Sequence, residues 1–168
     1  MIGKIVRPNK DDYYLNIAKA VSERSTCCYW KCGAIIVKPN GTIAGTGYNG
    51  STVASVNCID AKCCPYEYHT GAKPDGSQDQ CEGVHAEVNA MLHSRLENME
   101  GSTLYIYGYD RELEKEVPVR PNELTSRMIL NSGIKRIVTG SSEYTGGEDD
   151  LEETISSNIG GTITSGSR

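Results

Sequence analysis

The chain has 168 residues, of which 38% are hydrophobic and 23% charged, and its formal net charge is -5. This length suits one domain with a full hydrophobic core, which we expect over residues 1–168, and the acidic balance argues against general nucleic-acid binding, which needs a basic surface. Because no apolar run approaches the roughly 20 residues of a membrane helix, and residues 1–10 do not form a signal peptide, we expect a cytoplasmic protein with no membrane partner.

The first part of the chain predicts a helix and then a β-hairpin. Residues 11–24 carry apolar side chains at helical spacing, with acidic residues in the first turn. Residues 33–38 and 41–49 read as strands, and residues 39–41, Pro-Asn-Gly, form a turn signal between them. The apolar residues of 50–80 show neither helical nor strand spacing. So long a loop is unusual in a compact domain unless something such as a bound metal holds it in place.

The rest of the chain alternates helix and strand patterns. A helix is predicted to begin at Pro121, because proline suits the first helical turn. In chain order the predicted elements are a helix at 83–96, a strand at 102–109, a helix at 121–130, a strand at 134–140 and an acidic helix at 148–158. This order predicts an α/β fold of three αβα layers, with a mixed central sheet and helices on both faces.

All cysteines of the chain lie in its first half. Clustered cysteines in a protein without secretion signals are more often metal ligands than disulfides. The alternative is that they are small buried hydrophobic side chains. The seven positions are Cys27, Cys28, Cys32, Cys58, Cys63, Cys64 and Cys81.

A His-x-Glu triplet opens the predicted helix that follows the last cysteine. His85 could hold a zinc ion through a ring nitrogen, and Glu87 could reach a metal-bound water without binding the metal. In zinc-dependent base deaminases, a glutamate in this position moves protons between the water and the ring that is attacked. Alone the triplet is a weak signal, and the alternative is a surface histidine and glutamate on a helix.

Longer stretches of the chain resemble the deoxycytidylate (dCMP) deaminases, which have the cytidine deaminase-like fold. The stretch 24–50 contains R-S-T-C and T-G-Y-N-G, and residues 81–90 read C-E-G-V-H-A-E-V-N-A. Cys58 and Cys63 are spaced C-x4-C, and residues 126–138 match the family's last helix and strand. The resemblance runs from about residue 7 to residue 145, and it implies a hydrolase of nucleotide metabolism.

The resemblance implies two zinc sites. One is structural, with four thiolates that would order the loop insertion at 50–82, and Cys28, Cys64 or His69 could replace one member of the set. The other is catalytic, with His85 as a ligand and Glu87 as the proton shuttle. The matching structural ligands are Cys27, Cys58, Cys63 and Cys81.

The resemblance also implies a nucleotide pocket and a homo-oligomer. Asn49 matches the family residue that contacts the sugar. Tyr48 and Gly50 match the nucleotide-contacting turn around it, and Tyr144 lies near the position of an aromatic residue that packs against the base. The expected ligand is a pyrimidine nucleotide such as dCMP.

The sequence departs from the family at the catalytic site. The family has P-C-x-x-C before its last helix, but Asn122 and Thr125 stand at the two cysteine positions here. An amide oxygen and a neutral hydroxyl are poor zinc ligands, and catalytic zinc normally keeps three protein ligands. We therefore do not expect His85 alone to hold a tight catalytic zinc.

Two further departures lie nearby. Residues 108–120 form a charged insertion, longer than the family's usual link, that is predicted to be a hairpin over the pocket or on the surface. Cys32 stands where the family usually has valine, as a packed thiol, a replacement ligand or a nucleophile. The residues that could reshape the site are Asp110, Arg111, Arg120 and Glu123.

Three functions remain open from the sequence. The first is a deaminase with rebuilt metal ligands. The second is a metal-independent hydrolase or transferase of a nucleotide-like molecule, with Glu87 and His85 as general base and acid. The third is a non-catalytic nucleotide-binding subunit.

Overall fold

The computed structural model describes residues 6–74 and 81–140. Within them a sheet forms from β1, β2, β3, β4 and β5, in which β1 pairs antiparallel with β2 and β3, and β3 pairs parallel with β5. The sheet is therefore mixed, as predicted. The strands are β1 (Trp30–Val37), β2 (Ile43–Tyr48), β3 (Thr103–Asp110), β4 (Lys115–Glu116) and β5 (Arg136–Thr139).

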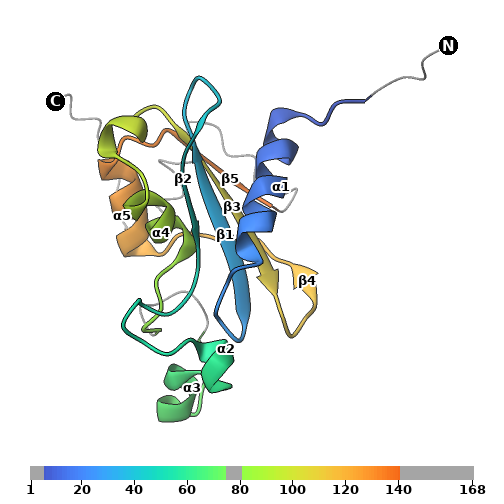
Figure 1. Ribbon diagram of the computed structural model, residues 1–168, viewed down its shortest axis with the longest axis vertical. Helices are drawn as coiled ribbons and strands as arrows, with labels where there is room; N and C mark the ends of the chain where they lie inside the picture. Colours follow the sequence, from blue (N-terminus) through green and yellow to red (C-terminus); the bar gives the residue numbers. More distant parts are fainter. Residues whose placement is uncertain (1–5, 75–80, 141–168) are drawn as a thin grey trace.

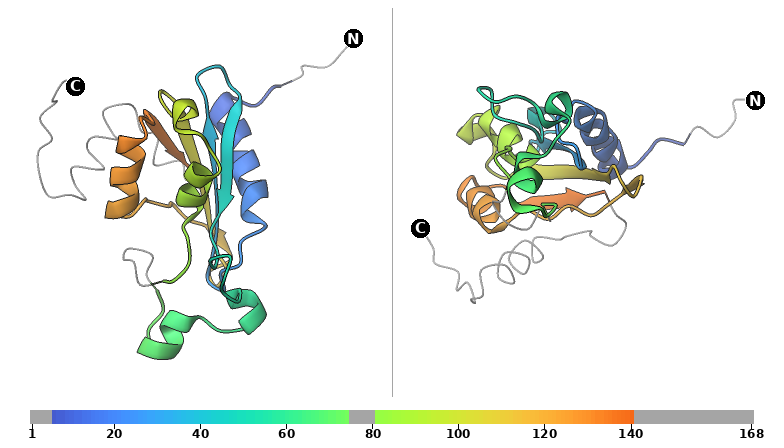
Figure 2. Two further views of the ribbon diagram at one scale, coloured as in Figure 1. Left: turned by 60° about the vertical axis from the view of Figure 1, so that its left-hand side comes forward. Right: turned by 90° about the horizontal axis from the view of Figure 1, so that it is seen from below.

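Helices cover both faces of the sheet. In Figure 1, α1 lies on one side of the strands and α4 and α5 lie on the other, and the left view of Figure 2 shows the same three layers. The predicted three-layer αβα architecture is confirmed. The helices are α1 (Lys10–Ser22), α2 (Cys58–Ala61), α3 (Pro65–Thr70), α4 (Ala86–Leu92) and α5 (Glu123–Asn131), with a short 3-10 helix at Leu96–Asn98.

The hydrophobic core has two parts, one on each face of the sheet. Ala34 and Ile36 of β1 pack with α4 and α5, whereas Ile35 and Val37 pack on the side of α1. Successive side chains of a strand point to opposite faces, so the unbroken apolar run of β1 fills both cores. This explains why β1 lies between two other strands and is covered on both faces.

A partly buried ion pair joins α1 to β5. The Asp11 carboxylate accepts hydrogen bonds from Arg136 Nη1 and Nη2, at 2.9 and 2.7 Å, and from the Tyr105 hydroxyl at 2.8 Å. Arg136, and then Tyr105, hold the pKa of Asp11 below its usual value, against the opposing effect of burial. Such a bidentate pair fixes the orientation of both side chains.

Several predicted boundaries were wrong. The stretch 50–80 is not without regular structure, because α2 and α3 lie within it. The helix predicted at 83–96 is shorter, since His85 is its N-cap and Leu92 its last residue. Pro121 does not begin α5, whose N-cap is Asn122.

The acidic helix predicted at 148–158 and the predicted contact residue Tyr144 lie outside the described residues. Across the described ranges, every helix is too short or too polar to traverse a lipid bilayer.

Candidate functional site

The start of α4 is held against the end of β2. Gly50 and Val84 exchange two backbone hydrogen bonds, from Gly50 N at 3.1 Å and from Val84 N at 2.7 Å. A Cβ on Gly47 would lie 2.3 Å from the backbone nitrogen of Ala90, so only glycine lets α4 approach β2 this closely. This close approach fixes where the residues at the N-terminus of α4 point.

His85 and Glu87 are brought together at that end of α4. His85 Nδ1 lies 3.4 Å from Glu87 Oε1. The Glu87 side chain is only 3% exposed, whereas that of His85 is 30% exposed. A buried carboxylate beside an imidazole is suited to proton transfer.

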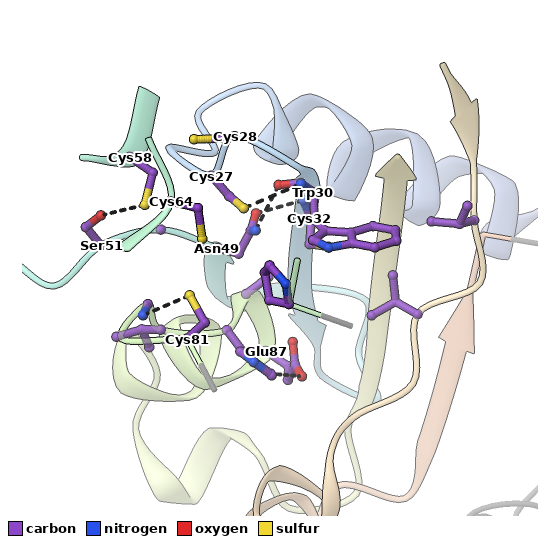
Figure 3. A pocket seen from close by; sticks show the side chains of 18 of the residues that line it. Cys27, Cys28, Trp30, Cys32, Asn49, Ser51, Cys58, Cys64, Cys81 and Glu87 are labelled. Carbon is purple, nitrogen blue, oxygen red and sulfur yellow. Dashed lines mark hydrogen bonds and ion pairs between the residues drawn. The ribbon is translucent and has the colours of Figure 1, made fainter. Parts of the chain in front are cut away.

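Both residues line a cavity of about 440 Å³. This volume lies within the roughly 300–1,000 Å³ of small-molecule sites. Figure 3 shows Glu87 and Cys81 in the lower part of the group of labelled side chains, and Cys28, Cys58 and Cys64 in its upper part. The predicted residues Asn49 and Gly50 also line the cavity, whereas Tyr48 is not among the described residues that line it.

Asn49 is fixed in the cavity by the backbone of β1. Its side-chain Oδ1 accepts the Cys32 backbone N–H at 2.8 Å, and its Nδ2 donates to the Trp30 carbonyl at 2.9 Å. The amide therefore has a set orientation. Burial, and then Glu87 and Cys27, raise the pKa of the neighbouring Cys32 thiol. A thiol that stays protonated is a poor nucleophile, which argues against that role for Cys32.

Five thiols besides that of Cys32 line the same cavity. Cys64 is buried and lines it, whereas its neighbour Cys63, predicted as a ligand, is exposed and does not. In Figure 3 the sulfur atoms of Cys64 and Cys81 point toward one another. These five thiols are those of Cys27, Cys28, Cys58, Cys64 and Cys81.

The donor chemistry of this thiol group suits zinc, which accepts four thiolates. Burial raises the pKa of Cys28 to about 11, with Cys58 and Cys27 adding to the shift. A cation would offset that cost of ionisation. The thiols are not gathered at one point, however, because within residues 6–74 and 81–140 no three His, Cys, Asp or Glu side chains are close enough to hold a metal ion.

Asn122 and Thr125, at the positions of the family's two catalytic cysteines, have a different role here. The Asn122 side chain accepts the Thr125 backbone N–H at 2.8 Å and so caps α5. Thr125 is only 2% exposed. Neither residue is among the described residues that line the cavity, so the side chains at hand do not fit a zinc site built on His85.

The insertion at 108–120 forms part of the cavity wall. Its strand β4 pairs with the end of β3, and the following residues Val117, Pro118, Val119 and Arg120 line the cavity.

Of the four residues expected to reshape the site, Arg120 alone is among the described lining residues. Asp110 instead accepts two backbone N–H groups of the hairpin turn. Arg111 donates to the Ser25 carbonyl at 3.4 Å, and Glu123 pairs with Arg127 on the surface.

Sequence reasoning missed three parts of the cavity. Trp30 precedes the predicted start of its strand, and nothing in the sequence signals its role. Val117 and Val119 are the apolar residues in an otherwise charged insertion, which could have marked them as facing inward. Cys64 was recognised only as a possible replacement for Cys63.

Comparisons with known proteins identify relatives of this chain. The family described as the cytidine and deoxycytidylate deaminase zinc-binding region matches residues 8–141. The deoxycytidylate deaminase of Mycobacterium phage D29 is 38% identical over 137 residues, covering 79% of this chain and 94% of that protein. That of Enterobacteria phage T4 is 33% identical over 154 residues, covering 74% of each chain.

A solved structure has the same overall fold. The dCMP deaminase of cyanophage S-TIM5, in complex with dCMP and dUMP, is 26% identical with a TM-score of 0.57, and the match covers 89% of this chain and 95% of that one. The sequence match over most of the chain and the shared cytidine deaminase-like fold lead to one conclusion. The chain belongs to the cytidine and deoxycytidylate deaminase family.

Proposed function

We propose that the cavity binds a pyrimidine deoxynucleotide such as dCMP. The observation that carries this proposal is that a fixed amide, Asn49, and a buried carboxylate, Glu87, line one cavity of nucleotide-compatible volume. The complex of the S-TIM5 relative with dCMP and dUMP supports it. Because the Asn49 amide is held in place, little ordering of that group is needed when the ligand binds.

We further propose that this chain does not use the family's zinc-dependent deamination. His85 is the one matching ligand, and the side chain of Asn122 is a helix cap. Within residues 6–74 and 81–140, no second and third side chain join His85 to form a metal-binding group. Whatever chemistry remains rests on the Glu87 carboxylate and the His85 imidazole, which can hold and transfer a proton at Glu87 Oε1.

A structural zinc is proposed among the cavity thiols. Cys27, Cys58, Cys64 and Cys81 would hold it, with Cys64 in place of the exposed Cys63. Bound there, zinc would supply folding stability rather than catalysis. The predicted homo-oligomer and cytoplasmic location stay predictions.

The test combines binding and turnover. Isothermal titration of the full chain with dCMP and dUMP should show binding of both, and incubation with dCMP should yield no dUMP above background. The double variant Asn122→Cys/Thr125→Cys, supplied with zinc, should gain conversion of dCMP to dUMP, and the added change Glu87→Gln should abolish that gain.

The outcomes separate the two proposals. If neither nucleotide binds, nucleotide recognition is wrong. If the unaltered chain converts dCMP and loses that activity with a chelator, the proposal about the lost metal site is wrong.

A further inference from the structure

The indole of Trp30 carries an unpaired hydrogen-bond donor. Trp30 lines the cavity, and its ring nitrogen Nε1 is buried with no hydrogen-bond partner among residues 6–74 and 81–140. Buried polar side-chain atoms of native proteins are nearly always paired, because a buried N–H without an acceptor is costly in free energy. An indole N–H can only donate, so the group that would relieve this cost is an acceptor.

The backbone of Trp30 is held on both sides. Its N–H donates to Cys27 Sγ at 3.4 Å, and its carbonyl accepts hydrogen bonds from the Ser25 hydroxyl at 3.0 Å and from Asn49 Nδ2 at 2.9 Å. Trp30 also pairs with Asp110, where β1 meets the end of β3. An adjustment of Trp30 to a bound ligand is therefore confined to its side chain.

The indole itself is less restrained than the backbone. Trp30 is only partly buried, and within the two described ranges no aromatic ring or cation stacks on its indole. In Figure 3 the indole extends away from the labelled cysteines. Because it borders a cavity of about 440 Å³, the ring has room to turn so that Nε1 meets a bound molecule.

The surroundings of the indole favour an uncharged acceptor. The insertion at 108–120, which includes the pairing partner Asp110, supplies the apolar side chains of Val117 and Val119 to the same cavity. A dianionic phosphate would lose hydration beside them, and one neutral N–H does not replace that hydration. A carbonyl oxygen costs far less to desolvate, and both cytosine and uracil carry one at C2.

We propose that the Trp30 indole turns toward the bound nucleotide and donates its Nε1 hydrogen to the C2 carbonyl oxygen of the pyrimidine. This inference rests on the proposed nucleotide binding and adds a residue that reads the base. Trp30 belongs to neither of the motifs at 24–27 and 46–50 through which the chain resembles the family.

The experiment removes the donor while keeping the shape of the ring. Trp30 is the one tryptophan of the chain, so global replacement of tryptophan alters this position alone. Trp30→benzothienylalanine has sulfur in place of the N–H, and Trp30→5-fluorotryptophan, which keeps the N–H, is the matched control. Affinities for dCMP and for 2-thio-dCMP, in which sulfur replaces the C2 oxygen, are measured by isothermal titration.

The affinity for dCMP should fall about five- to hundredfold in Trp30→benzothienylalanine, the scale of a lost hydrogen bond that leaves a buried group unpaired. It should stay the same in Trp30→5-fluorotryptophan. The affinity for 2-thio-dCMP should be nearly equal in all three proteins, because effects of two groups in direct contact are not additive. Without ligand, Trp30→benzothienylalanine should melt no lower than the unaltered chain, since the donor that it lacks has no partner there.

Three results would overturn the inference. One is an unchanged dCMP affinity in Trp30→benzothienylalanine, and another is an equal loss for dCMP and 2-thio-dCMP, which would mean that the shape of the ring matters rather than its N–H. The third is a lower melting temperature of this variant without ligand, which would show that the N–H is already paired within the protein. If the unaltered chain does not bind dCMP, the proposed function itself fails, and this inference fails with it.

Discussion

Replacing Asn122 by alanine should destabilise the protein through the loss of one hydrogen bond. Asn122 Oδ1 accepts the Thr125 N–H at 2.8 Å, and Thr125 is buried, so this N–H would lose its partner where water has little access. Loss of an N-cap typically costs about 1 kcal/mol. For a chain of this size that lowers the melting temperature by about 2–4 °C.

Thermal denaturation followed by circular dichroism measures the effect. Asn122→Asp is the matched control, because the carboxylate can accept the same N–H and is favoured by the helix dipole, so its melting temperature should stay near that of the unaltered chain. If alanine at 122 is as well tolerated as aspartate, the cap contributes nothing, and the physical reason we give for asparagine at this position fails.

Three further predictions concern the insertion, the loss of stability at low pH and the thiols. Gly108→Ala should displace Val119, costing about 1–3 kcal/mol of stability and several-fold in dCMP affinity, as followed by melting and titration; unchanged values would show that the close contact is readily relieved. The carboxyl of Asp11 has a lower pKa folded than unfolded, so its ion pair stabilises fully above the unfolded value of about 3.9 and progressively less as the pH falls through the folded value. Urea denaturation of Asp11→Asn should therefore show a flatter profile below pH ~4 than the unaltered chain, and identical profiles would contradict this. Cys64→Ser should lower zinc content and melting temperature while Cys63→Ser should not, and the reverse pattern would restore Cys63 as the ligand.

The fold was predictable because the spacing of apolar residues along the sequence clearly indicates helices and strands. The run at 33–38 and the strand at 102–109 lie within or close to β1 and β3, and both are buried on two faces. Predicted helix boundaries were wrong where neighbouring residues give competing signals. Proline at 121 suits a first helical turn, but the asparagine that follows it is the better cap, so α5 begins one position later than that cap.

The site was predictable only in part. His85, Glu87 and Asn49 were found because their spacing matches a family pattern, and the structure brings all three to one cavity. The choice between Cys63 and Cys64 depends on which face of the loop turns inward. The sequence of two neighbouring cysteines does not show which of them points into the cavity, because that depends on how α2 and α3 fold around them. The positions of Trp30 and of the inward-facing residues of the insertion could not be predicted, because they depend on pairing between residues distant in sequence.

A zinc count on the purified full chain, by inductively coupled plasma mass spectrometry, distinguishes a structural zinc from a catalytic one. We expect one zinc per chain, retained in His85→Ala and lost in Cys64→Ser, and a second zinc only in Asn122→Cys/Thr125→Cys. Two zinc ions in the unaltered chain, one of them lost in His85→Ala, would contradict it.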